Sequence, residues 1–152
     1  SALLGFGARM KIIEDYDPSL PPALGDKDQL LQVVLNLIKN ASEAADTTAG
    51  GTIRLHTYYE HSFRMRRADG TGQSLPLQVE IIDDGPGLPE EIRGDIFDPF
   101  VSGRENGTGL GLALVSKIVS DHDGWISVDS VPGRTVFRMS LPRAAGETKE
   151  NT

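Results

Sequence analysis

The chain has 152 residues, of which 38% are apolar and 24% are charged, a composition typical of one globular domain with a hydrophobic core. Its formal net charge of −7 argues against general affinity for nucleic acid or for an acidic membrane surface. The lack of cysteine excludes disulfides and thiolate metal sites, and no apolar run has the length that spans a membrane. The absence of cysteine fits a reducing compartment, and we expect a cytoplasmic domain.

The first half of the chain predicts a strand, a long helix and a second strand. Residues 10–15 (MKIIED) form the expected strand, and Asp26 is a candidate cap for a helix from Asp28 to about Asp46. Apolar side chains at three- and four-residue spacing give this helix its core-facing stripe, made of Leu30, Val34, Leu37, Ala41 and Ala44. The alternating residues 52–60 predict a strand, and the polar, turn-rich residues 61–76 predict a hairpin extension.

The second half predicts a strand at residues 77–83, a short helix at 89–97, a longer helix at 110–122 and two strands around a Pro-Gly turn. Because helices and strands are mixed and no repeat is visible, we predict an α/β sandwich in which helices cover one face of one mixed sheet. We expect a single domain over residues 10–143. Residues 1–9 read as linker from a longer protein, and residues 144–152 as a disordered polar tail.

Two asparagines in the first helix form the first candidate site. Asn36 and Asn40 are four residues apart, so they project from one side of the helix, at the flank of the apolar stripe. Asparagine is a poor helix former, and its amide oxygen is a ligand that suits Mg²⁺. The pair is therefore either a set of helix-surface amides or part of a magnesium site.

The segment IIDDGPGLP, residues 81–89, is the second candidate site. An apolar, β-rich run ends at Asp83, and Gly85 and Gly87 follow. A carboxylate only accepts hydrogen bonds, which suits the exocyclic amine of adenine, and glycines let the backbone pass close beneath a base. A strand that ends in a tight turn has the same composition, so this segment alone allows both interpretations.

The third candidate site is the segment FVSGRENGTGLGLALVSKIV, residues 100–119, where glycines directly precede an apolar helix pattern. Helix N-termini expose unpaired N–H groups that favour anions, so the segment predicts a phosphate site; a flexible, glycine-rich cap is the alternative. A dinucleotide-binding fingerprint is excluded because it requires a strand before the glycines, and DPFVSGREN has the composition of a loop.

Taken together, the three segments resemble the ATP-binding catalytic domain of sensor histidine kinases, in the GHKL superfamily. NLIKNASEA resembles the N box, DDGPG the first glycine box, IFDPFVSG the F box, GTGLGLAL the second glycine box and PGRTVFRMSLP the last glycine and threonine segment. Their order and spacing agree from Met10 to Pro142. Residues 15–44 and the segment FVSGRENGTGLGL are also similar to the nitrogen-regulation sensor kinases, the NtrB type.

This resemblance implies the Bergerat ATPase fold and individual roles for the candidate residues. Asn40 matches the Mg²⁺ ligand of the family, and Asn36 matches a second polar position near the metal and the triphosphate. Asp83 matches the carboxylate that binds adenine, with Gly85 and Gly87 beside it. The implied ligands are therefore ATP or ADP together with Mg²⁺.

The resemblance also implies roles in the second half of the chain. Residues 99–108 match the ATP lid, and Arg104 falls where relatives carry a basic residue near the γ-phosphate. Thr135 matches the threonine that supports the adenine side. Glu43 departs from the pattern, because many relatives carry a basic residue there. The positions that match the phosphate-binding segment are Gly107, Thr108, Gly109, Leu110 and Gly111.

The implied function is phosphoryl transfer from ATP to a histidine on the kinase's own dimerisation and phosphoacceptor domain. His56, His61 and His122 lack the setting of that acceptor, which is expected upstream of Ser1. A response-regulator receiver domain and a PII signalling protein are the further implied partners. An ATPase of the same superfamily is one alternative, although Asn36 stands where hydrolytic members carry a glutamate base. A nucleotide sensor without turnover is the other.

Overall fold

The computed structural model describes residues 11–23, 25–45, 51–66, 69–90, 96–97 and 109–144. The elements within these ranges are β1 (Lys11–Asp15), α1 (Lys27–Ala45), β2 (Thr52–Tyr59), β3 (Arg64–Arg66), β4 (Gly72–Ser74), β5 (Leu77–Asp83), α2 (Gly109–Asp121), β6 (Trp125–Val131) and β7 (Arg134–Leu141). No helix in these ranges is long and apolar enough to cross a membrane.

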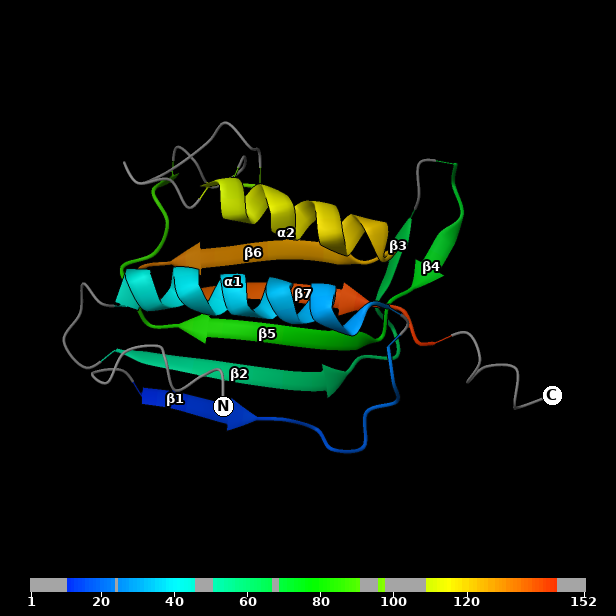
Figure 1. Ribbon diagram of the computed structural model, residues 1–152, viewed down its shortest axis with the longest axis horizontal. Helices are drawn as coiled ribbons and strands as arrows, with labels where there is room; N and C mark the ends of the chain where they lie inside the picture. The colour runs from blue at the N-terminus through cyan, green and yellow to red at the C-terminus, as the bar shows by residue number, and fades with distance from the viewer. Residues whose placement is uncertain are drawn as a thin grey trace.

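Within the described residues, five strands form one mixed sheet in the order β1-β2-β5-β7-β6 (Figure 1). The pair β1–β2 is parallel, and the other neighbours are antiparallel. Strands β3 and β4 form a separate hairpin in the predicted 61–76 extension. The predicted mixed sheet and its strands are therefore confirmed, whereas most of the expected helix at 89–97 lies outside the described residues.

Helices α1 and α2 contact each other and cover one face of the sheet, α1 against β2 and β5 and α2 against β6 (Figure 1). The predicted stripe of α1 is correct at Leu37 and Ala41, which are buried. Leu30 and Val34 are only partly buried, whereas the fully buried positions include Val33 and Ile38. The difference arises because α1 packs against the sheet and α2 at once, which widens its buried arc beyond one stripe.

The start of α1 is held by two connections. The predicted cap is confirmed, because Oδ1 of Asp26 accepts hydrogen bonds from the backbone N–H groups of Asp28 and Gln29, at 2.9 and 3.1 Å. The backbone N–H of Asp26 donates to Nε2 of His122 at 3.0 Å, and Nδ1 of His122 donates to the carbonyl of Ile118 at 2.7 Å. Both ring nitrogens of His122 thus join the start of α1 to the end of α2.

A polar network centred on Glu80 occupies the face of the sheet that the helices leave uncovered. The Glu80 carboxylate accepts hydrogen bonds from Nε of Arg138 at 2.8 Å and from the hydroxyl of Tyr58 at 3.0 Å, and Nδ1 of His56 lies 3.3 Å away. Burial acts to raise the pKa of Glu80, but these three partners outweigh burial and hold the pKa below its ordinary value.

Replacing Glu80 by glutamine is expected to lower the free energy of unfolding at pH 7 by about 1–3 kcal/mol, because charge-assisted hydrogen bonds are lost. The folded-state pKa of Glu80 is lowered, so its stabilisation is fully present above the ordinary value of 4.5 and disappears as the pH falls through the folded pKa. Urea unfolding between pH 7 and pH 3 measures this dependence. Glu90→Gln, at an exposed position, is the control, and a Glu80→Gln deficit that stays constant to pH 3 would contradict the prediction.

Candidate functional site

Asp83 belongs to a row of buried side chains that crosses four strands on the helix-covered face. In the strand register Ile53 lies opposite Asp83, Asp83 opposite Thr135, and Thr135 opposite Ser130. Asp83 is 2% exposed, and Thr135 and Ser130 are each 3% exposed. Three polar residues therefore lie side by side at a depth where apolar side chains would be expected, which is typical of a functional site.

The glycine-containing loop after Asp83 is held against the β6–β7 hairpin at two points. The Gly85 carbonyl accepts from the backbone N–H of Gly133 at 2.9 Å, and the backbone N–H of Leu88 donates to Oγ of Ser130 at 2.8 Å. Oδ1 of Asp83 accepts from the N–H of Gly85 at 2.9 Å, so the loop also orients the carboxylate. The loop after Asp83 is therefore fixed to the turn end of the β6–β7 hairpin.

Gly87 has a backbone conformation that requires glycine. Its φ is +92°, and a Cβ added there would lie 3.0 Å from the carbonyl oxygen of Val131 and 3.2 Å from Oγ of Ser130. Both the positive φ and the close approach disfavour any side chain. The close approach seen at Gly87 is to the β6–β7 hairpin, and the expected approach to a base stays a prediction.

Asn36 lies at the middle of α1, and Asn40 lies in its C-terminal half. Figure 1 shows that the C-terminal half of α1, the start of α2 and the C-terminal tip of β5 gather at one end of the sheet. Asn40 is 7% exposed, and its amide makes no hydrogen bond to another described side chain; Asn36 is half-buried. A buried amide in mid-helix without such a partner is available to an external ligand.

The predicted phosphate-side residues are only partly described by the structure. The first turn of α2 contains Gly109, Leu110 and Gly111. The backbone N–H groups of a first turn have no acceptor within the helix. Arg104, Gly107 and Thr108 lie outside the described residues, as do residues 99–108 as a whole. Their assignment to the ATP lid and their contacts with phosphates remain predictions.

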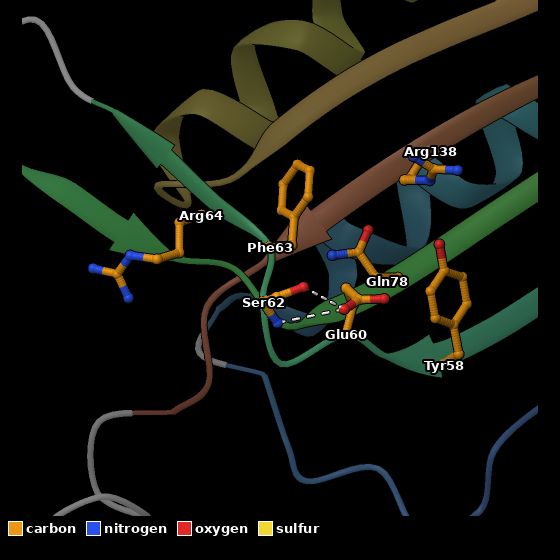
Figure 2. Close-up of a pocket in the computed structure, with 7 residues that line it drawn as sticks. All are labelled: Tyr58, Glu60, Ser62, Phe63, Arg64, Gln78 and Arg138. Atoms are coloured by element: carbon orange, nitrogen blue, oxygen red, sulfur yellow. Dashed lines mark hydrogen bonds between the residues drawn. The ribbon is translucent and has the colours of Figure 1, made fainter.

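A cavity of about 460 Å³ lies on the uncovered face, beside the β3–β4 hairpin (Figure 2). Its lining includes Gln78, at the start of β5, whereas Asp83 ends that strand on the opposite face. Two polar side chains of this cavity are paired within the protein: Gln78 donates to the Leu75 carbonyl and accepts from Ser140, both at 2.7 Å, and Glu60 accepts from the Ser62 hydroxyl at 2.7 Å. This pairing indicates a structural role for Gln78 and Glu60.

Residues 25–145 match the family described as "Histidine kinase-, DNA gyrase B-, and HSP90-like ATPase". The chain belongs to this ATPase family. Membership confirms the predicted α/β sandwich and the resemblance to GHKL domains, and it implies that the domain binds a nucleotide.

Within this family, the chain is similar to individual sensor histidine kinases. The sensory histidine kinase/phosphatase NtrB of Rhodobacter capsulatus is 71% identical over 147 residues, which cover 97% of this chain and 41% of the relative. The nucleotide-free catalytic domain of the histidine kinase ThkA is 27% identical with a TM-score of 0.68, over 89% of this chain and 80% of that one. Full-length ShkA in complex with AMPPNP is 26% identical with a TM-score of 0.69, over 89% of this chain and 26% of that one.

This chain spans less than half the length of the NtrB relatives it matches. The match covers 41% of the Rhodobacter capsulatus protein and 34% of the Azospirillum brasilense protein. The description sensory histidine kinase/phosphatase applies to those whole proteins, of which this chain matches a part. What they imply for this chain is therefore part of the proposal below.

Ser130 is the residue of this site that the sequence analysis missed. Its side chain has the same strand parity as Ile126 and Val128, which pack against the core. A serine at a core-facing position in an alternating strand was the available signal, because a buried hydroxyl needs a hydrogen-bond partner. Its partner on the 85–88 loop is not apparent from the sequence.

Proposed function

We propose that residues 10–143 are the catalytic domain of an NtrB-type sensor histidine kinase that acts in the cytoplasm on nitrogen regulation. The domain binds ATP with Mg²⁺ and donates the γ-phosphoryl group to a histidine of the kinase's own phosphoacceptor domain. The observation that carries this proposal is the buried Asp83 carboxylate, oriented by a glycine loop at the end of the sheet where the C-terminal half of α1, which contains Asn40, also lies. The 71% identity to a sensory histidine kinase/phosphatase NtrB supports it.

The nucleotide would be held at two sets of groups. The Asp83 carboxylate accepts a hydrogen bond from the exocyclic amine of adenine. The base is lined beside it by Gly85, Gly87 and Thr135. The phosphates are received by the N–H groups at the start of α2, where a helix favours anions. The residues proposed for this phosphate side are Arg104, Gly107, Thr108, Gly109, Leu110 and Gly111.

Magnesium fits the side chains on α1. Among the described residues, no three His, Cys, Asp or Glu side chains form a group that could hold a metal ion. Mg²⁺ takes few protein ligands when phosphates and water complete its octahedron, so the amide oxygens of Asn40 and Asn36 suffice on the protein side. When bound, the ion neutralises charge on the phosphates during transfer.

The chemistry is an in-line displacement at phosphorus. The bond from the γ-phosphorus to its bridging oxygen breaks, a bond to the acceptor histidine nitrogen forms, and ADP leaves. The domain contributes positioning and charge stabilisation. A response-regulator receiver domain then takes the phosphoryl group, and a PII signalling protein controls the kinase.

A hydrolytic ATPase is the competing function, and Asn36 argues against it. Asn36 is half-buried on α1, one turn before Asn40, and stands where hydrolytic members of the superfamily carry a glutamate. An amide cannot accept a proton from water at neutral pH, so this position cannot supply the general base.

We expect the 152-residue chain to bind ATP without labelling itself, and to label the added phosphoacceptor domain from ATP carrying a labelled γ-phosphate. The label should be acid-labile, as phosphohistidine is, and it should vanish when the acceptor histidine is replaced. Free phosphate without labelled protein would favour the ATPase, and ATP binding without any transfer would favour a nucleotide sensor. Acid-labile label on the isolated chain would contradict the expected separation of donor and acceptor.

A further inference from the structure

The hydroxyl of Ser130 links two parts of the candidate site that are far apart in the sequence. Its Oγ accepts a hydrogen bond from the backbone N–H of Leu88 at 2.8 Å, and it lies 2.8 Å from Oγ1 of Thr135. Both hydroxyls are almost completely buried, so water does not replace these bonds. Ser130 therefore connects the loop after Asp83 to the threonine opposite Asp83 in the sheet.

The two hydroxyls carry one proton more than their mutual hydrogen bond uses. Each hydroxyl has one proton, and the bond between Ser130 and Thr135 consumes one of the two. Neither hydroxyl has another acceptor among the described residues. Because a buried donor without an acceptor is costly, the second proton requires a partner beyond these residues.

The order of the hydrogen bonds decides which hydroxyl holds that second proton. Ser130 Oγ already accepts from Leu88, and an oxygen that accepts one hydrogen bond becomes a better donor in the next. The favoured chain therefore runs from the Leu88 N–H to Ser130 and from the Ser130 O–H to Thr135. The remaining proton belongs to Thr135, which is the cross-strand neighbour of the Asp83 carboxylate.

We infer that Ser130 is a positioning residue for nucleotide binding, which holds Leu88 in place and directs the hydroxyl proton of Thr135 to the bound base. This inference rests on the proposed function, in which Asp83 and Thr135 line the adenine. Ser130 acts through Thr135, so the effects of removing the two hydroxyls should not be independent.

The test is a double-mutant cycle on the 152-residue chain, with ADP and Mg²⁺ titrated by calorimetry. Ser130→Ala and Thr135→Val are each expected to weaken ADP binding about five- to thirtyfold, as one hydrogen bond would. The double variant should bind ADP about as Ser130→Ala does. Ser127→Ala is the matched control, because Ser127 lies on the same strand with its side chain on the uncovered face, opposite Arg138.

The outcomes separate this inference from the proposed function. Wild type that binds no ADP would overturn both. Wild type that binds ADP, with Ser130→Ala unchanged or with the two single effects multiplying in the double variant, would overturn only the role of Ser130. Circular dichroism and thermal melting verify folding, and if Ser130→Ala does not fold, Ser130→Cys takes its place in the cycle with the same expected loss.

Discussion

Replacing Asp83 by asparagine is expected to weaken ADP binding by about ten- to a hundredfold, because a hydrogen bond to a charged group is worth about 1.5–3 kcal/mol. Asparagine keeps an oxygen that can accept from the N–H of Gly85, so the loop should stay in place. Its amide nitrogen, however, donates where the amine of adenine also donates. We therefore expect base recognition to be lost while the contact with Gly85 is kept.

Guanine provides the sharper comparison for Asp83. It carries a carbonyl oxygen where adenine carries its amine, so in wild type the carboxylate would face another acceptor. We expect ADP to bind about ten- to a hundredfold more tightly than GDP, and Asp83→Asn to remove most of this preference. Calorimetric titration of both proteins with both nucleotides measures it, with circular dichroism as the test of folding.

The neighbouring aspartate supplies a matched control for this prediction. Asp84 is exposed, and its Oδ1 accepts from the backbone N–H of Thr52 at 3.0 Å, away from the buried row. Asp84→Asn should leave ADP affinity within about twofold, as surface substitutions usually do. Equal binding of GDP and ADP by wild type would show that Asp83 does not read the base.

Replacing Asn40 by alanine is expected to weaken nucleotide binding in the presence of Mg²⁺ by at least the roughly ten- to hundredfold that the loss of an outer-shell partner of a metal costs. The reason is that the amide oxygen is proposed as a direct ligand. Without Mg²⁺ the loss should be about threefold or less, because only a minor contact to the nucleotide disappears. Titrating ADP with Mg²⁺ and with a chelator measures both values.

Gln32→Ala controls for the loss of a helix amide. Gln32 is exposed two turns before Asn40 on the same helix, so this variant removes an amide that does not enter the site. It should leave binding unchanged under both conditions. Equal losses with and without Mg²⁺ in Asn40→Ala would instead assign Asn40 a packing role, which its 7% exposure would then explain.

The secondary structure was largely predictable because its signals are local. The apolar run LQVEIID bounded by turn residues predicts β5 with the bounds that the structure has, and the Asp26 cap is confirmed by two hydrogen bonds. The burial of α1 was predicted less well. Val33 and Ile38 are fully buried because α2 packs on a second side of α1, which the periodicity of one helix does not reveal.

The sequence by itself determined the residue types of the candidate site: an aspartate that ends a strand, glycines that follow it, and two asparagines one helical turn apart. These are properties of short segments, and their chemistry is readable without the fold. Only the tertiary structure decided that Asp83, Thr135 and Ser130 form one buried row, because strand register pairs residues that are distant in the chain. Ser130 gains its proposed role in this way, since the hydrogen bond from Leu88 spans 42 positions of sequence.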